Sequence, residues 1–277
     1  MSTLQVTTVE TGSATTDLLL QTANTSAGEI LIRSGGGMNL HSNSTFSALN
    51  VGTGGNLIVS NNISGKFAGN TVLVRETIYV SNATHTKVGN LVSMMVYCIG
   101  AGGAGGTATG AATATGSVGA AGGGGGGCAI KILLNAEVGA TSNVTVGIGS
   151  TGSGSNSTFA NSTNGLITGQ GGTAASTTTP GIGGPAINGD FNIPGGDGSS
   201  GTGTGVAIAF AVSGSGGTSG KGLGGAGAAV RSNAAGSAGD LYGGGGAGAA
   251  QGNTAATLTG GNGANGAVWV IEYYNGV

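Results

Sequence analysis

Glycine occupies 65 of the 277 positions, and no other feature of this sequence limits the possible folds as strongly. Glycine loses more backbone freedom on folding than any other residue and costs about 1 kcal/mol relative to alanine inside a helix. Charged residues make up 6% of the chain and aromatic residues 4%, so neither an ordinary helical core nor an α/β core fits this inventory. The chain is therefore either disordered or held together by dense backbone hydrogen bonding.

Apolar runs in the C-terminal part predict β-strands at residues 94–99, 128–134, 144–148 and 268–274. No segment between them has a convincing helical pattern. We therefore predict an all-β fold in which residues 93–277 form one glycine-rich domain. A disordered, low-complexity protein is the competing interpretation, and the spaced β-branched strands argue against it.

The first part of the chain has a different composition. Residues 1–63 read as short strands separated by turn residues, which predicts a stalk or anchor. Such short strands expose unpaired edges, so we expect either an intertwined homotrimer or docking onto a larger particle. A small β-sandwich lobe is the alternative. Residues 64–92 are predicted to connect the two parts through strands at 71–75 and 77–80.

The glycine runs at residues 122–127, 243–246 and 260–263 suggest a specific kind of element. A left-handed helix with three residues per turn makes no internal hydrogen bonds, so its N–H and C=O groups must be met by neighbours. Only glycine allows neighbouring backbones to come that close. We therefore expect polyglycine helices, of the polyproline II type, packed side by side and together with the strands.

Charge and hydropathy exclude two kinds of partner. The net charge is −2 and the seven basic residues are scattered, which offers no stripe for nucleic acid. No apolar run approaches 18 residues, so we expect no membrane insertion. The N-terminus has no signal-peptide pattern, which predicts assembly in a cytoplasm or export without a cleaved signal.

Candidate catalytic, cofactor and metal sites are weak. Residues 100–105 match G-x-G-x-x-G, but no helix is predicted after them and no acidic residue lies about twenty positions on. Asp190, Asp197 and Asp240 share no repeat register and are expected in turns, and His85 is expected to be solvated at a strand edge. We therefore predict no enzyme activity, no cofactor and no metal.

The two cysteines, Cys98 and Cys128, do not form a disulfide framework. We expect both to be buried as small apolar side chains. Their spacing does not decide whether they are bridged.

Several segments, quoted with their positions, together resemble a known family: THTKV (84–88), VYCIGAGGAGG (96–106), NVTVGIG (143–149), STF (157–159) and GGNGANGA (260–267). They resemble, in order, the glycine-rich domains of tail fibre proteins of tailed bacteriophages, including the adhesins at the tips of long tail fibres of T-even-like phages. The resemblance covers about residues 84–277. It implies polyglycine II helices joined by distal loops that recognise a host receptor.

The resemblance also implies partners and a location. We expect a virion protein of the tail or fibre, assembled in the host cytoplasm, that binds a host outer-membrane protein or surface glycan. Other tail or fibre proteins are expected partners, with residues 1–63 as the virion anchor where the adhesins instead cap a fibre made of another protein. A head fibre, decoration protein or fibre connector without receptor recognition is the alternative.

Inserts between the glycine runs are the expected recognition loops, because binding residues are concentrated in loops. They lie at residues 107–119, 173–180, 187–194, 206–212 and 228–238. The apolar insert 206–212 fits either a receptor-contacting patch or a buried strand. The candidate receptor-binding residues are Thr173, Thr178, Phe191, Ile208, Phe210, Val212 and Arg231.

Overall fold

The computed structural model describes residues 72–109, 116–161, 165–203, 210–222, 226–231, 233–252 and 256–275. This part of the chain is all-β, as predicted, and its only helical residues form a single 3-10 turn at Asn135–Glu137. The predicted strands of residues 1–63 lie outside the described residues.

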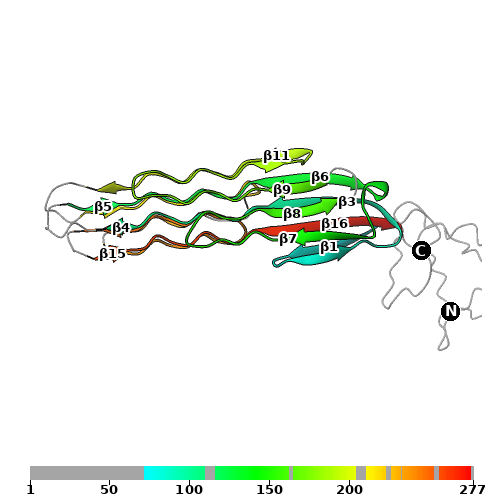
Figure 1. Ribbon diagram of the computed structural model, residues 1–277, viewed down its shortest axis with the longest axis horizontal. Helices are drawn as coiled ribbons and strands as arrows, with labels where there is room; N and C mark the ends of the chain where they lie inside the picture. Colours follow the sequence, from blue (N-terminus) through cyan, green and yellow to red (C-terminus); the bar gives the residue numbers. More distant parts are fainter. Residues whose placement is uncertain are drawn as a thin grey trace, which may run out of the picture. The chain divides into compact units, whose positions relative to one another are not determined.

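Two antiparallel sheets form a sandwich at one end of the described part (Figure 1). The first, called sheet A, has the order β1 (Val72–Tyr79), β16 (Ala267–Asn275), β3 (Leu91–Ile99), β6 (Cys128–Leu134) and β11 (Phe191–Ile193).

Sheet B has the order β10 (Ala186–Ile187), β9 (Gly165–Gly169), β8 (Ser157–Asn161), β7 (Thr141–Thr145) and β2 (Ala83–Thr86). Strands β1 and β2 thus pair with strands of the glycine-rich part, β16 and β7.

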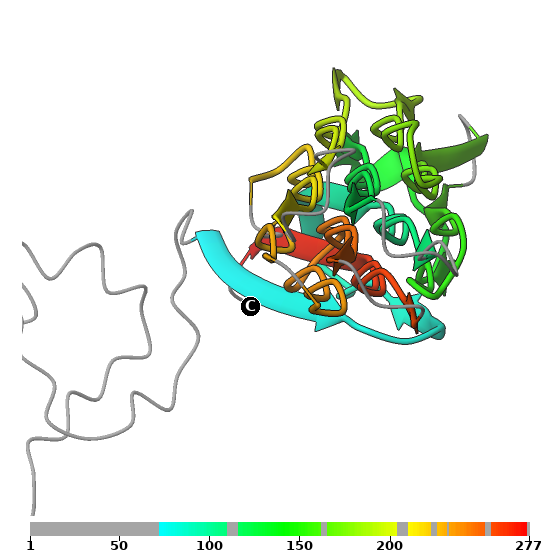
Figure 2. The same cartoon turned by 90° about the vertical axis from the view of Figure 1, so that its left-hand side faces the viewer.

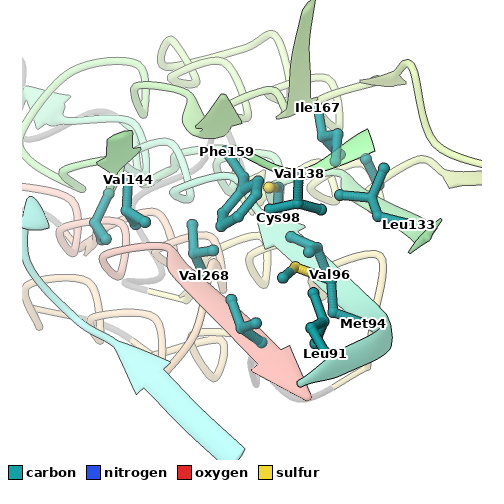
Figure 3. Packing of buried hydrophobic residues seen from close by; sticks show 13 residues of the cluster. Leu91, Met94, Val96, Cys98, Leu133, Val138, Val144, Phe159, Ile167 and Val268 are labelled. Atoms are coloured by element: carbon teal, nitrogen blue, oxygen red, sulfur yellow. The ribbon is translucent and has the colours of Figure 1, made fainter. Parts of the chain in front are cut away.

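The apolar core fills the space between the two sheets (Figure 3). Alternate residues of each strand point inward, as the two-residue period of a strand requires. Because Phe159 is the one buried phenylalanine in this core, branched aliphatic side chains supply most of the apolar burial. The buried members are Leu91, Met94, Val96, Cys98, Ala129, Leu133, Val138, Val144, Val146, Phe159, Ile167, Val268 and Val270.

Glycine-rich segments continue from the strands and run side by side away from the sandwich (Figures 1 and 2). Backbone hydrogen bonds join these segments to one another. Successive N–H groups of residues 100–106 donate hydrogen bonds to three different neighbouring segments in turn. Residues 100, 103 and 106 donate to residues 121–127, residues 101 and 104 donate to 152–155, and residues 102 and 105 donate to 261–264. The bonding pattern therefore repeats every three residues, whereas a β-strand repeats every two.

The run of glycines at 122–127 lies at the centre of this array. Its N–H groups donate to three segments, and its carbonyl oxygens accept from three others. Every N–H and every C=O of the run is thereby paired, which meets the requirement for buried backbone. The acceptor segments are 196–199, 243–246 and 170–173, and the donor segments are 181–184, 217–220 and 100–103.

Such close approach leaves no room for side chains at the contact points. A Cβ atom on Gly245 would lie 2.3 Å from the carbonyl oxygen of Gly123, and one on Gly103 would lie 2.1 Å from that of Thr173. The backbone of one segment thus occupies the space that a side chain of the next would fill. This packing therefore requires glycine at the points where neighbouring segments touch.

Most of the predicted strands are confirmed. Residues 94–99, 128–134 and 268–274 lie within β3, β6 and β16, whereas 144–148 is half right, because the strand ends at Thr145. Residues 71–80 contribute one strand, β1, instead of two. The insert 187–194 is not a free loop, since Phe191–Ile193 pairs with the edge strand β6.

Candidate binding surface

Three pairs of short strands gather at the end of the glycine segments that lies away from the sandwich, on the left in Figure 1. They are β4 (Ala108–Thr109) with β15 (Thr257–Leu258), β5 (Val118–Gly119) with β14 (Ala250–Gln251), and β12 (Thr202–Gly203) with β13 (Ala211–Val212). We call this end, with the turn at residues 176–179 and residues 230–234, the distal surface.

Side-chain hydrogen bonds fix the backbone of the distal surface. The hydroxyl of Ser117 donates to the carbonyl oxygen of Phe210 at 2.7 Å, and that of Thr177 donates to the carbonyl oxygen of Thr107 at 2.9 Å. The N–H of Gly252 donates to Oδ1 of Asn233 at 2.9 Å. Each bond joins segments far apart in sequence, so the turns are held in one arrangement.

The exposed side chains of the distal surface are mainly small and polar. Threonine hydroxyls dominate, Phe210 is an aromatic ring with 49% exposure, and Arg231 contributes an exposed guanidinium group. No aspartate or glutamate belongs to the described residues of this surface. Its chemistry suits hydrogen bonding, ring stacking and pairing with an anionic group. The exposed polar residues include Thr107, Thr109, Thr177, Thr178, Thr202, Asn233 and Thr257.

The candidate residues from the sequence fall into three groups. Thr178, Phe210, Val212 and Arg231 lie on the distal surface, where a β-bridge joins Val212 to Arg231. The other three, Thr173, Phe191 and Ile208, do not belong to the described part of the distal surface.

Thr173 lies within the array of glycine segments, where its N–H donates to Ile182 and its carbonyl accepts from Gly124. Phe191 lies on β11 of the sandwich. Ile208 lies outside the described residues.

Thr107 and Thr109 fall in the predicted loop 107–119 but were not named as candidate residues, and Thr202 and Thr257 fall outside every predicted loop. All four are exposed on the distal surface. Only their positions in the sequence could have indicated these threonines. Each one stands next to a glycine-rich stretch that joins the array, so it marks a place where the chain reverses. In a chain rich in threonine, residue type alone carries no such information.

A second polar cluster lies inside the sandwich and is centred on the fully buried Glu272. Its carboxylate pairs with the guanidinium of Arg75 and accepts the N–H of Val88 at 3.1 Å. His85 Nε2 lies 3.4 Å from the same carboxylate, and the hydroxyl of Tyr79 contacts His85 Nδ1 at 2.9 Å. Because β1 and β16 belong to sheet A and β2 to sheet B, this cluster ties the sheets together.

The expectation that His85 is solvated is wrong, since only 1% of its surface is exposed. Burial lowers the pKa of His85, although the nearby Glu272 opposes that effect. His85 packs against the ring of Phe159, and its imidazole is enclosed by the core and the Glu272 cluster. The contacts of the cluster join residues of both sheets inside the sandwich.

Cys98 and Cys128 are both free and buried, which confirms their predicted packing role. Cys98 stands opposite Ala129, and Cys128 stands opposite Ile99, so the two side chains point to opposite faces of sheet A. That register leaves the two thiols on different sides of the sheet and prevents a bridge.

The described residues contain no cluster of three His, Cys, Asp or Glu side chains suited to a metal ion. Within the same part of the chain, no helix is long and apolar enough to cross a membrane. No protein-family model matches this chain, and no curated protein matches its sequence.

Proposed function

We propose that the glycine segments are polyglycine II helices, and that the protein is a bacteriophage tail fibre adhesin that binds a host surface receptor through its distal surface. The receptor is an outer-membrane protein or a surface glycan. The protein acts by binding and not by catalysis. Residues 1–63 anchor it to other tail or fibre proteins of the virion, after assembly in the host cytoplasm.

The placement of the distal surface carries this proposal. Residues 1–71 join the described part at Val72, which stands opposite Asn275. The glycine segments leave sheet A at the other end, beyond Ile99 and Ala267, which also pair. An attachment at one end and a set of turns at the other, joined by a backbone-bonded array, is the arrangement that an adhesin needs.

The array also supports a mechanism. Bonds between six neighbours and the central run 122–127 make the segments a stiff support, so the turns are held in place before they meet a receptor. Preorganised loops lose less conformational freedom on binding. Several weak contacts per virion then add through effective concentration, which gives firm yet reversible attachment.

Adsorption competition tests the proposal. Purified protein at saturating concentration should block adsorption of its parent phage to host cells. Replacement of Phe210 and Arg231 by alanine should abolish that block, because it removes the large ring and the cation of the distal surface. Circular dichroism should show an unchanged fold, since both side chains are exposed.

Asn143→Ala, on the outer face of sheet B, is the matched control and should compete like the wild type. Phe191→Ala separates the two locations of the candidate residues and should also compete normally. A folded wild-type protein that never competes would contradict receptor recognition and favour a connector or decoration role.

A further inference from the structure

The outer face of sheet A, which points away from the core, is almost entirely apolar. Strand register places its residues in rows that run across the sheet. One row is Val74, Tyr273, Ser93 and Leu134. The next is Glu76, Ile271, Met95 and Ile132. The third is Ile78, Trp269, Tyr97, Ile130 and Phe191. We call these three rows the apolar face.

Many of these side chains are open to solvent. Exposure reaches 54% for Val74, 50% for Ile78, 47% for Ile132, 60% for Leu134 and 61% for Phe191. Single exposed apolar residues need no explanation, but contiguous ones on one sheet face do. Contact of such a face with water is unfavourable, and burial against a partner removes it.

The outer face of sheet B provides an internal comparison. On β2 and β7 it presents Thr84, Thr86, Thr141, Asn143 and Thr145, all exposed and polar. Leu166 and Ile187 are its exposed large apolar residues. One sandwich therefore carries a polar outer face suited to water and an apolar outer face that is not.

Other segments of the same chain cover one end of the outer face of sheet A. This covered part ends at the third row of the apolar face. In the next row, Ala267, Ile99 and Cys128 are buried, whereas Ile193 at the edge of the sheet is 38% exposed. Lys221 reaches over the third row, with Nζ 3.4 Å from the ring centroid of Tyr97 and 3.6 Å from that of Trp269. A small apolar pocket of about 230 Å³, lined by Ile78, Ile99, Tyr242, Ala267 and Trp269, marks this limit.

The size of the apolar face matches a contact between proteins. The three rows hold thirteen positions, each about 4.8 Å by 6.7 Å, and cover roughly 400 Å² for each copy. That is near the largest apolar patch of an ordinary monomer, about 300–600 Å². Two such faces together reach roughly 800 Å², close to the lower limit of about 1,000 Å² for a specific interface.

We propose that the apolar face is the contact surface between copies of this chain. An apolar sheet face packs well against a second apolar sheet face, and a second copy provides one. The charges near the face do not oppose this. Glu76 lies within the face and Lys221 at its border, close enough for Glu76 to favour the charged form of that lysine. The two side chains carry opposite charges, so together they add no net charge to the face and its border.

Light scattering of the full-length chain over a range of concentrations tests this inference. The wild type should form a dimer or trimer. The double substitution Ile132→Glu and Leu134→Glu should weaken association at least roughly 100-fold, because it places carboxylates in an apolar contact. Both positions are open to solvent in one copy, so thermal unfolding should show an intact fold.

The matched control is Thr141→Glu with Asn143→Glu on the outer face of sheet B, which should associate like the wild type. If the glutamate pair on β6 fails to fold, Ile132→Ser with Leu134→Ser removes the apolar contact without charge. If the wild type stays monomeric, the inference is wrong. This holds whether residues 1–71 or another protein covers the face. An oligomer that the β6 substitutions leave intact would overturn it as well.

Discussion

Replacement of Gly124 by alanine tests whether backbone contact holds the glycine segments together. The new Cβ would lie 2.1 Å from the carbonyl oxygen of Ile182, whereas ordinary contact begins at 3.4 Å. The segments must therefore separate by about 1.3 Å (3.4 − 2.1). Such a shift breaks the two hydrogen bonds that join these segments, from Gly181 to Gly122 and from Gly184 to Gly125, now 2.9 and 2.8 Å long.

The expected magnitude follows from these contacts. Two lost hydrogen bonds cost about 2 kcal/mol and overpacking costs about 1–3 kcal/mol, while the stiffer unfolded chain returns about 0.4–1 kcal/mol. The net loss is about 3 kcal/mol of unfolding free energy. For a domain of this size, Tm should fall by about 6–12 °C, measured by circular dichroism or calorimetry.

Gly89→Ala is the control, because a Cβ there meets nothing within 4 Å. Its unfolding free energy should change by no more than about 0.5 kcal/mol. If Gly124→Ala melted within about 2 °C of the wild type, the steric account of the glycine content would be refuted. A control that lost as much stability would refute it equally.

Three further predictions concern the sandwich. Burial lowers the pKa of His85, so the unfolded chain binds a proton near pH 6.5 that the folded chain does not. The free energy of unfolding, measured by urea titration, should therefore fall as the pH drops below 6.5. In His85→Gln it should fall less steeply. Burial raises the pKa of Cys128 to about 11 and raises that of Cys98 as well, so a thiol reagent at pH 8 should label neither cysteine until denaturant is added. Asp190→Asn removes the 2.8 Å ion pair with Lys131 on the surface, and should change unfolding free energy by only about 0–1 kcal/mol in calorimetry.

The sequence by itself determined the class of the fold. Charge and aromatic content were too low for a helical core, and the runs at 94–99, 128–134 and 268–274 gave three of the central strands. These predictions depend on local pattern, because a strand with alternate buried residues has a period of two wherever it lies. Short polar strands such as Ser157–Asn161 were not predicted, since threonine and asparagine give no apolar alternation.

Tertiary structure alone decided which residues meet. Thr178, Phe210 and Arg231 lie on the same distal surface because their segments turn at the end away from the sandwich. Phe191 instead pairs with β6 and stays at the sandwich. His85 is buried beside Glu272, which lies 187 positions away in the chain. The apolar face likewise exists only through strand register, which aligns residues from five strands that are far apart in the chain. Local composition cannot encode such contacts, since their energy arises only when distant segments are packed together.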